Sequence, residues 1–161
     1  MRAVFGDMVT EIGPGALSNV DFYHDQSFPK QISCIRQTAF IQNKSLIAFE
    51  TDLEYVGTSA FANCTNLSSA DMTRLSSIPD YCFVNAALAE VNLSVANSVG
   101  ECCFKGCRRL SSAISPEVTD IGPSAFYGCS GISSIDLHNC ESIGSYAFAG
   151  TSVSALDLPN I

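Results

Sequence analysis

The chain has 161 residues, a length typical of one domain, and 47% of them are hydrophobic, which is compatible with a well-filled core. Eight basic and 16 acidic residues give a formal net charge of −8. Phosphate binding needs clustered Lys and Arg, so this balance argues against a nucleic-acid partner. No apolar run approaches the roughly 18 residues of a membrane span, and residues 1–7 lack the continuous apolar stretch of a secretory signal.

A small residue followed by an aromatic one recurs along the chain. Subtracting successive Phe numbers gives spacings of 21, 22, 21, 22 and 22. Ala16-Leu17 begins the series, 23 residues before Phe40. The other six pairs are Ala39-Phe40, Ala60-Phe61, Cys82-Phe83, Cys103-Phe104, Ala125-Phe126 and Ala147-Phe148. This periodicity predicts seven units of 21–23 residues in register.

Further columns follow the same period. Five residues before the aromatic position stand Ile12, Ile35, Val56, Ile78, Val99, Ile121 and Ile143. The next residue is often glycine, as in Gly13, Gly57, Gly100, Gly122 and Gly144. We interpret this glycine column as a tight bend that returns the chain. An alternating stretch follows each Phe, and in residues 67–72 the alternation predicts a strand with Leu67, Ala70 and Met72 facing the core and Asp71 facing out.

One such strand cannot bury its apolar face alone, whereas stacked units bury a continuous column at every repeated position. The sequence therefore predicts a strand-rich repeat solenoid of the α/β type. It is expected to be right-handed and to form a single domain over residues 1–161, with a parallel sheet on its concave face. Four residues depart from their columns and should loosen or reshape their coils: Gln26, Arg36, Pro79 and Ser115.

The columns resemble one family of repeats. Residues 118–137, Val-Thr-Asp-Ile-Gly-Pro-Ser-Ala-Phe-Tyr-Gly-Cys-Ser-Gly-Ile-Ser-Ser-Ile-Asp-Leu, match the BspA-type, or Treponema pallidum-type, leucine-rich repeat most fully. The resemblance extends from about residue 9 to residue 161. It implies a non-catalytic module that recognises a protein or glycan, adhesin-like and located on the cell surface or outside the cell. Because fold does not determine function, these implications remain expectations.

Eight cysteines invite a disulfide or zinc interpretation. Most occupy repeat positions instead, three residues after Phe or directly before it, where free cysteine serves as a small core residue. Stacked positions lie roughly 5 Å apart, within the Cα range of a disulfide, although parallel side chains usually miss the required torsion. Oxidation therefore stays open for the pairs Cys107–Cys129 and Cys82–Cys103. No C-x-x-C pair supports a metal site.

Catalytic chemistry finds little support. His24 and His138 are the two histidines, and their positions in the repeat are far apart. Neither stands beside a nucleophile and an orienting group, as a hydrolytic triad requires. The glycines serve the repeat period and form no phosphate-binding loop. We expect a protein that is not an enzyme and that has no catalytic residue, cofactor site or metal site.

The outward positions of the predicted strands are mostly acidic or small. We predict a partner-binding surface there, formed by Glu50, Asp71, Glu90, Asn92, Ile114, Asp136 and Asp157. Stacked carboxylates repel one another and gain when a cation or hydrogen-bond donor settles between them. A cationic protein segment or a glycan would fit this surface. The alternative is a sheet face kept polar for solubility.

The two ends of the repeat array indicate a second possible function. Val4, Phe5 and Val9 resemble the tail of a preceding coil, and no amphipathic cap is visible at residues 158–161. Solenoids need their terminal coils shielded. We therefore expect the C-terminal coil to be covered by further sequence or by another chain, through Leu156, Leu158 and Ile161. The alternative function is a structural subunit or fragment of a larger assembly, such as a virion or other particle, that stacks through its ends.

Overall fold

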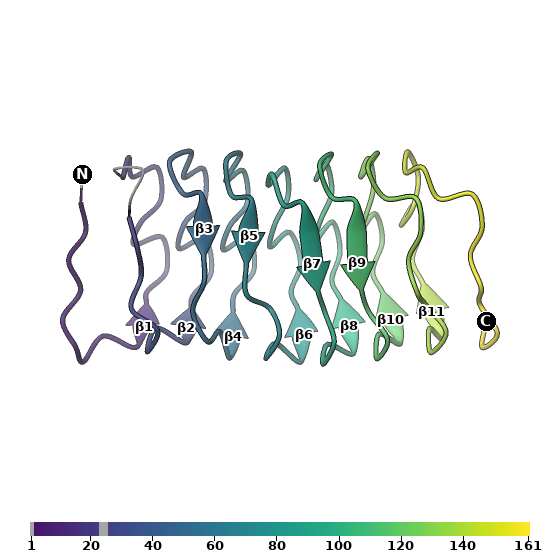
Figure 1. The fold of residues 1–161 in the computed structure, drawn as a ribbon, viewed down its shortest axis with the longest axis horizontal. Helices are drawn as coiled ribbons and strands as arrows, with labels where there is room; N and C mark the ends of the chain where they lie inside the picture. The colour runs from purple at the N-terminus through teal and green to yellow at the C-terminus, as the bar shows by residue number, and fades with distance from the viewer. Residues whose placement is uncertain (1, 23–25) are drawn as a thin grey trace.

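The computed structural model describes residues 2–22 and 26–161. Within these ranges the chain forms short parallel strands joined by turns, with no helix. Coils stack side by side along one long axis, and the two termini lie at opposite ends (Figure 1). The strand-rich solenoid expected from the repeat is confirmed. We number the coils 1–7, and they begin at Val9, Ile32, Leu53, Leu75, Ala96, Val118 and Cys140.

The Ile and Val column forms the first set of strands, which we call the lower ladder after its place in Figure 1. These strands are β1 (Glu11–Ile12), β2 (Cys34–Ile35), β4 (Tyr55–Val56), β6 (Ser77–Ile78), β8 (Ser98–Val99), β10 (Asp120–Ile121) and β11 (Ser142–Ile143). They pair in parallel in two groups, β1-β2-β4 and β6-β8-β10-β11. In each strand the second residue, Ile or Val, faces the core, and the residue before it is more exposed to solvent. The sequence interpretation had assigned this region to a bend, so these strands were missed.

The alternating stretches form the second set of strands, at the front of Figure 1. They are β3 (Ala48–Phe49), β5 (Ser69–Ala70), β7 (Glu90–Asn92) and β9 (Ser112–Ile114), paired as β3–β5 and β7–β9. The sheet expected across all units is therefore shorter, because residues 132–137 and 153–158 are not strands. Between coils 4 and 5 the amide of Leu93 donates to Ile114 O at 2.7 Å. At the equivalent place between coils 5 and 6 the hydroxyl of Ser115 donates to Asp136 O at 2.8 Å, so a side chain stands in for the backbone donor.

A ladder of phenylalanine rings forms the centre of the core. Successive rings from Phe40 to Phe148 stack with centroids 5.3–5.6 Å apart. The rings of coils 2–6 are at most 1% exposed. Phe28 and Phe49 extend this cluster toward coil 1. Burying one such side chain contributes about 1.5–3 kcal/mol, so the column supplies much of the stability.

Left-handed backbone conformations flank every aromatic position. The residue two before it and the residue two after it have positive φ in all seven coils, as in Ser59 and Asn63 on either side of Phe61. The amides of these three residues all point to the next coil, where they donate to carbonyls at 3.1, 2.9 and 2.7 Å. The later column is rich in Asn and Gly, which adopt this conformation readily. The earlier column begins with Gly15 but then holds Thr, Ser, Tyr and Cys, which give no such signal.

The glycine column has a different cause from the one expected. Gly57, Gly100, Gly122 and Gly144 do not have positive φ, so backbone freedom does not explain them. A Cβ added at Gly122 would lie 2.7 Å from Glu101 N and from Gly100 C in the preceding coil. At these four junctions the backbones of neighbouring coils approach so closely that a Cβ would force one of them to shift.

One buried hydroxyl has no partner. Thr51 is fully buried, and its Oγ1 forms no hydrogen bond with any described residue. Thr51→Val keeps the shape of the side chain and removes an unsatisfied polar atom. We expect the free energy of unfolding to rise by about 1 kcal/mol in urea denaturation. Ser115→Ala is the matched control, because that buried hydroxyl is bonded and its loss should destabilise. A destabilising Thr51→Val would show that the hydroxyl finds a partner in solution.

Candidate functional site

The predicted partner-binding residues lie on the front of the solenoid, over the strands of the second set. We call this surface the acidic face. The register Ala48↔Ser69 places Glu50 beside Asp71, and Asn92 pairs directly with Ile114. Ile114 is 55% exposed and lines a hollow of about 120 Å³ with Glu90 and Asn92. Asp136 and Asp157 occupy the same column in coils 6 and 7, where no strand forms.

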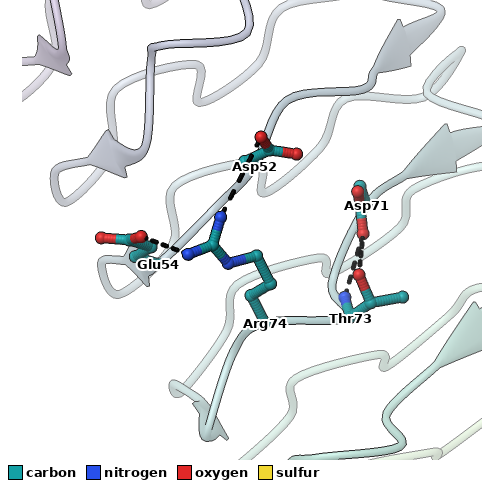
Figure 2. Close-up of polar contacts among 5 residues, drawn as sticks. All are labelled: Asp52, Glu54, Asp71, Thr73 and Arg74. Carbon is teal, nitrogen blue, oxygen red and sulfur yellow. Dashed lines mark hydrogen bonds and ion pairs between the residues drawn. The ribbon is translucent and has the colours of Figure 1, made fainter.

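Three members of this surface serve local turns. The Oδ1 of Asp71 accepts from the amide and the hydroxyl of Thr73, at 3.0 and 2.7 Å (Figure 2). Asn92 accepts from the amide of Ser94 at 3.0 Å, and Asp136 from that of His138 at 3.1 Å. Asp and Asn side chains commonly bond the amide two residues on and so initiate a turn. This role was missed, although an Asp or Asn where the strand stretch ends is the signal for it.

Three of the serines beside the acidic column are also engaged. Ser68 and Ser111 donate their hydroxyls to carbonyls of the preceding coil, each at 3.1 Å. Ser69 donates to Oε1 of Glu50 at 2.6 Å. The carboxylates of Glu90 and Asp157 have no hydrogen-bond or ion-pair partner among residues 2–22 and 26–161. The free polar groups of this surface are therefore these two carboxylates and the hydroxyls of Ser112, Ser133, Ser134 and Ser154.

Three of the eight cysteines form a column with a structural role. All eight are free thiols, and seven are buried. Cys64, Cys107 and Cys129 donate Sγ–H to the Phe carbonyl of the preceding coil at 3.0–3.1 Å. Asn43 takes the same place in coil 2 and donates to Leu17 O at 3.1 Å. The column therefore supplies a small buried donor between coils, which explains why cysteine suits it.

Burial should protect these thiols from reagents. It raises the pKa of Cys64 and Cys129 to about 12, which suppresses the reactive thiolate at neutral pH. We expect a thiol-specific reagent at pH 8 to label about one site quickly in the folded protein. That site is Cys34, the only cysteine of the eight that is not buried. Unfolding in denaturant should expose all eight. Six or fewer titratable thiols in the unfolded, unreduced protein would contradict the free state.

The candidate metal ligands lie apart in the described part of the chain. No group of three His, Cys, Asp or Glu residues there is placed to hold a metal ion. His138 is exposed, and His24 lies outside the described residues. In the same ranges no helix is long and apolar enough to cross a membrane.

The two ends of the solenoid differ in their backbone groups. We call the stretch from three residues before the aromatic position to two residues after it the aromatic arc. In coils 1–6, three amides of each aromatic arc donate to the next coil. The corresponding amides of Tyr146, Phe148 and Gly150 find no acceptor among the described residues. Beside them is a hollow of about 270 Å³ lined in part by Phe148, Val153 and Leu156. Leu158 is half-buried, and Ile161 is 63% exposed.

The N-terminal segment packs as part of a preceding coil, as its sequence suggested. Phe5 contacts Phe28 with ring centroids 5.4 Å apart. The amide of Gln26 bonds both backbone groups of Ala3, accepting at 2.8 Å and donating at 3.1 Å. This polar residue at an inward position therefore links two segments instead of loosening its coil.

Parallel coils and a stacked aromatic column define a leucine-rich-repeat solenoid. The family model for the BspA type leucine rich repeat region matches residues 2–111 and 73–161, with six copies, and the chain belongs to this family. A module of this family is expected to act in protein interactions. No curated protein matches the chain.

Two solved structures match the chain, and the first of them shares its fold. A leucine-rich repeat protein from Eubacterium ventriosum superposes with a TM-score of 0.79 at 21% identity, over 91% of this chain and 42% of that one. A second, from Bacteroides ovatus, has a TM-score of 0.33 at 16% identity, over 94% and 64% of the two chains. The present chain thus spans less than two thirds of either protein.

Proposed function

We propose that the protein is a non-catalytic recognition module whose acidic face binds a cationic protein segment. One observation carries this proposal: no described residue forms an ion pair with a carboxylate of that face. The ion pairs of the described chain lie elsewhere, joining Arg36 to Glu11, and Arg74 to Asp52 and Glu54. None of these ion pairs neutralises a carboxylate of the acidic face.

The stacking of the coils strengthens the case for a cationic partner. Residues at equivalent positions of adjacent coils are separated by about 4.8 Å, the spacing of parallel strands. Like charges held at this distance repel each other. An extended segment with Lys or Arg side chains would relieve this repulsion at several coils at once.

A charge-neutral triple variant tests the proposal. Glu50→Gln, Glu90→Gln and Asp157→Asn remove three charges and leave the turn-forming Asp71, Asn92 and Asp136 intact. We expect binding of an octalysine peptide, measured by titration calorimetry, to weaken about tenfold, or about 1.4 kcal/mol. Added salt should weaken binding to the wild type in the same direction.

The control removes the same number of charges elsewhere, by Asp7→Asn, Glu117→Gln and Glu141→Gln, all exposed. Binding should change little in this control. Equal weakening in both triple variants would show that only net charge matters and would contradict a specific face.

We also propose an adhesin-like location on the cell surface or outside the cell, which the family resemblance supports. Antibody labelling of intact cells, compared with permeabilised cells, tests this location. Labelling that requires permeabilisation would contradict it.

A second candidate function is head-to-tail stacking of copies. The three free amides of coil 7 match the arc carbonyls of Pro14, Ala16 and Ser18, which accept no bond from a preceding coil in the described chain. We expect the mass measured by light scattering to grow with protein concentration. Leu156→Asp together with Ile161→Asp should keep the protein monomeric. A constant monomer mass for the wild type would contradict stacking.

A further inference from the structure

The solenoid is open at one junction. In the lower ladder β4 pairs with β2 and β6 pairs with β8, but β4 and β6 do not pair. The two ribbons are visibly farther apart there than at neighbouring junctions (Figure 1). The second set of strands is interrupted at the same place, between β5 and β7. Coils 3 and 4 are therefore separated along both ladders.

Pro79 explains the break in the lower ladder. At the other junctions of the lower ladder, the residue in this column donates its backbone amide to the preceding coil. Gly57 N, for example, donates to Ile35 O at 2.8 Å. Proline has no backbone N–H, so Pro79 cannot donate a hydrogen bond to the carbonyl oxygen of Val56. Arg36 occupies the same column and also carries a Cβ, yet it donates to Ile12 O at 2.9 Å and its ladder is intact. The missing donor, rather than the bulk of a side chain, separates the two coils.

The aromatic arc keeps the same junction closed on its other side. Phe61 and Phe83 stack at 5.3 Å, and Phe61 N donates to Cys82 O at 2.9 Å. Asn85 also donates its side-chain amide to Oδ1 of Asn63 at 2.9 Å. Coils 3 and 4 are therefore held together at the aromatic arc and separated at the lower ladder. We call the opening between them the slot.

The slot has a volume of about 180 Å³. It is lined by Glu54, Tyr55, Val56, Thr58, Leu75, Ser76, Ser77 and Pro79. The ladder bond from Ser77 N to Glu54 O is absent within the described residues, so the slot has a free backbone donor and a free acceptor. Hydroxyls of Thr58, Ser76 and Ser77 add groups that can donate or accept.

One aromatic ring lines the slot, and two arginines contact residues of its lining. Tyr55 is 49% exposed, and the guanidinium of Arg36 lies 5.3 Å from its ring centroid. Arg74 donates to Glu54 at 2.6 Å and lies 4.0 Å from Asp52 (Figure 2). The carboxylates near the slot are therefore compensated, in contrast with those of the acidic face.

We propose that this slot binds a single neutral sugar residue. A volume below the range of drug-sized pockets suits one pyranose ring. Sugar hydroxyls can donate to Glu54 O and Val56 O, and a sugar oxygen can accept from Ser77 N. The aliphatic face of the ring packs against Tyr55. Compensation of Glu54 and Asp52 by Arg74 favours a neutral ligand over an ammonium group. The site is separate from the acidic face and independent of its function.

The test uses ¹⁵N-labelled protein titrated with methyl glycosides of glucose, galactose, mannose and N-acetylglucosamine. We expect saturable shifts of the Tyr55 and Ser77 amides with at least one of them. Tyr55→Ala should weaken that binding at least tenfold. Tyr146→Ala is the matched control, because this tyrosine is 74% exposed at a distant coil, and binding should not change.

Pro79→Gly restores the missing donor and should let the ladder close. We expect slower hydrogen exchange at the Ser77 amide together with at least a tenfold loss of glycoside binding. Three outcomes would overturn the proposal: no saturable shift with any of the four glycosides, unchanged binding in Tyr55→Ala, or tighter binding of putrescine than of every glycoside.

Discussion

Phe83→Ala is expected to lower the free energy of unfolding by about 3–5 kcal/mol, enough to unfold much of a marginally stable domain. Phe83 is fully buried, and its ring is stacked between Phe61 and Phe104 at 5.3 and 5.6 Å. Truncation would leave a cavity in the middle of the ladder, where coils fixed on both sides cannot collapse into it. Urea denaturation followed by circular dichroism measures the loss.

Phe148→Ala is the control for this prediction. Phe148 ends the same ladder, stacks on Phe126 alone and is only half-buried. We expect a clearly smaller loss, because part of the side chain already contacts solvent. Equal losses at the two positions would contradict a central role for stacking between coils.

Gly122→Ala should destabilise by about 1–3 kcal/mol or more, although it adds only one methyl group. The new Cβ would lie 2.7 Å from backbone atoms of Glu101 and Gly100, which cannot move without opening the junction between coils 5 and 6. The melting temperature and the urea midpoint measure this effect.

Gly13→Ala is the matched control. Gly13 occupies the same column, but a Cβ there meets nothing within 4 Å. Its φ is not positive, so alanine should be neutral or stabilise by about 0.4–1 kcal/mol through the unfolded state. If both variants behaved alike, close approach of coils would not be the reason for the glycine column.

The functional proposals use different surfaces and can fail separately. Cationic binding depends on free carboxylates of the acidic face, whereas the slot depends on a proline in the lower ladder. The two sets of variants share no residue. Loss of peptide binding with intact glycoside binding, or the reverse, would assign each activity to its own site.

Much of the candidate site was readable from the column positions. The period placed Glu50, Asp71, Asn92 and Ile114 on one surface, because equivalent residues of stacked units must lie side by side. What the period could not show was which polar groups are already engaged. Asp71 and Asn92 serve their own turns, and this depends on backbone geometry that a residue type alone does not determine.

The sequence by itself determined the repeat, its family, the buried columns and the aromatic ladder, because each follows from which residues recur at which spacing. Tertiary structure alone decided how neighbouring coils meet. It showed that the glycine column reflects the close approach of neighbouring backbones and not a bend in the chain. It also showed that the hydroxyl of Ser115 donates a hydrogen bond where another coil uses a backbone amide. It also showed that Pro79 opens a slot where Arg36 does not. These features depend on hydrogen bonds and contacts between residues about 21–23 positions apart, which become definite only once the coils are stacked.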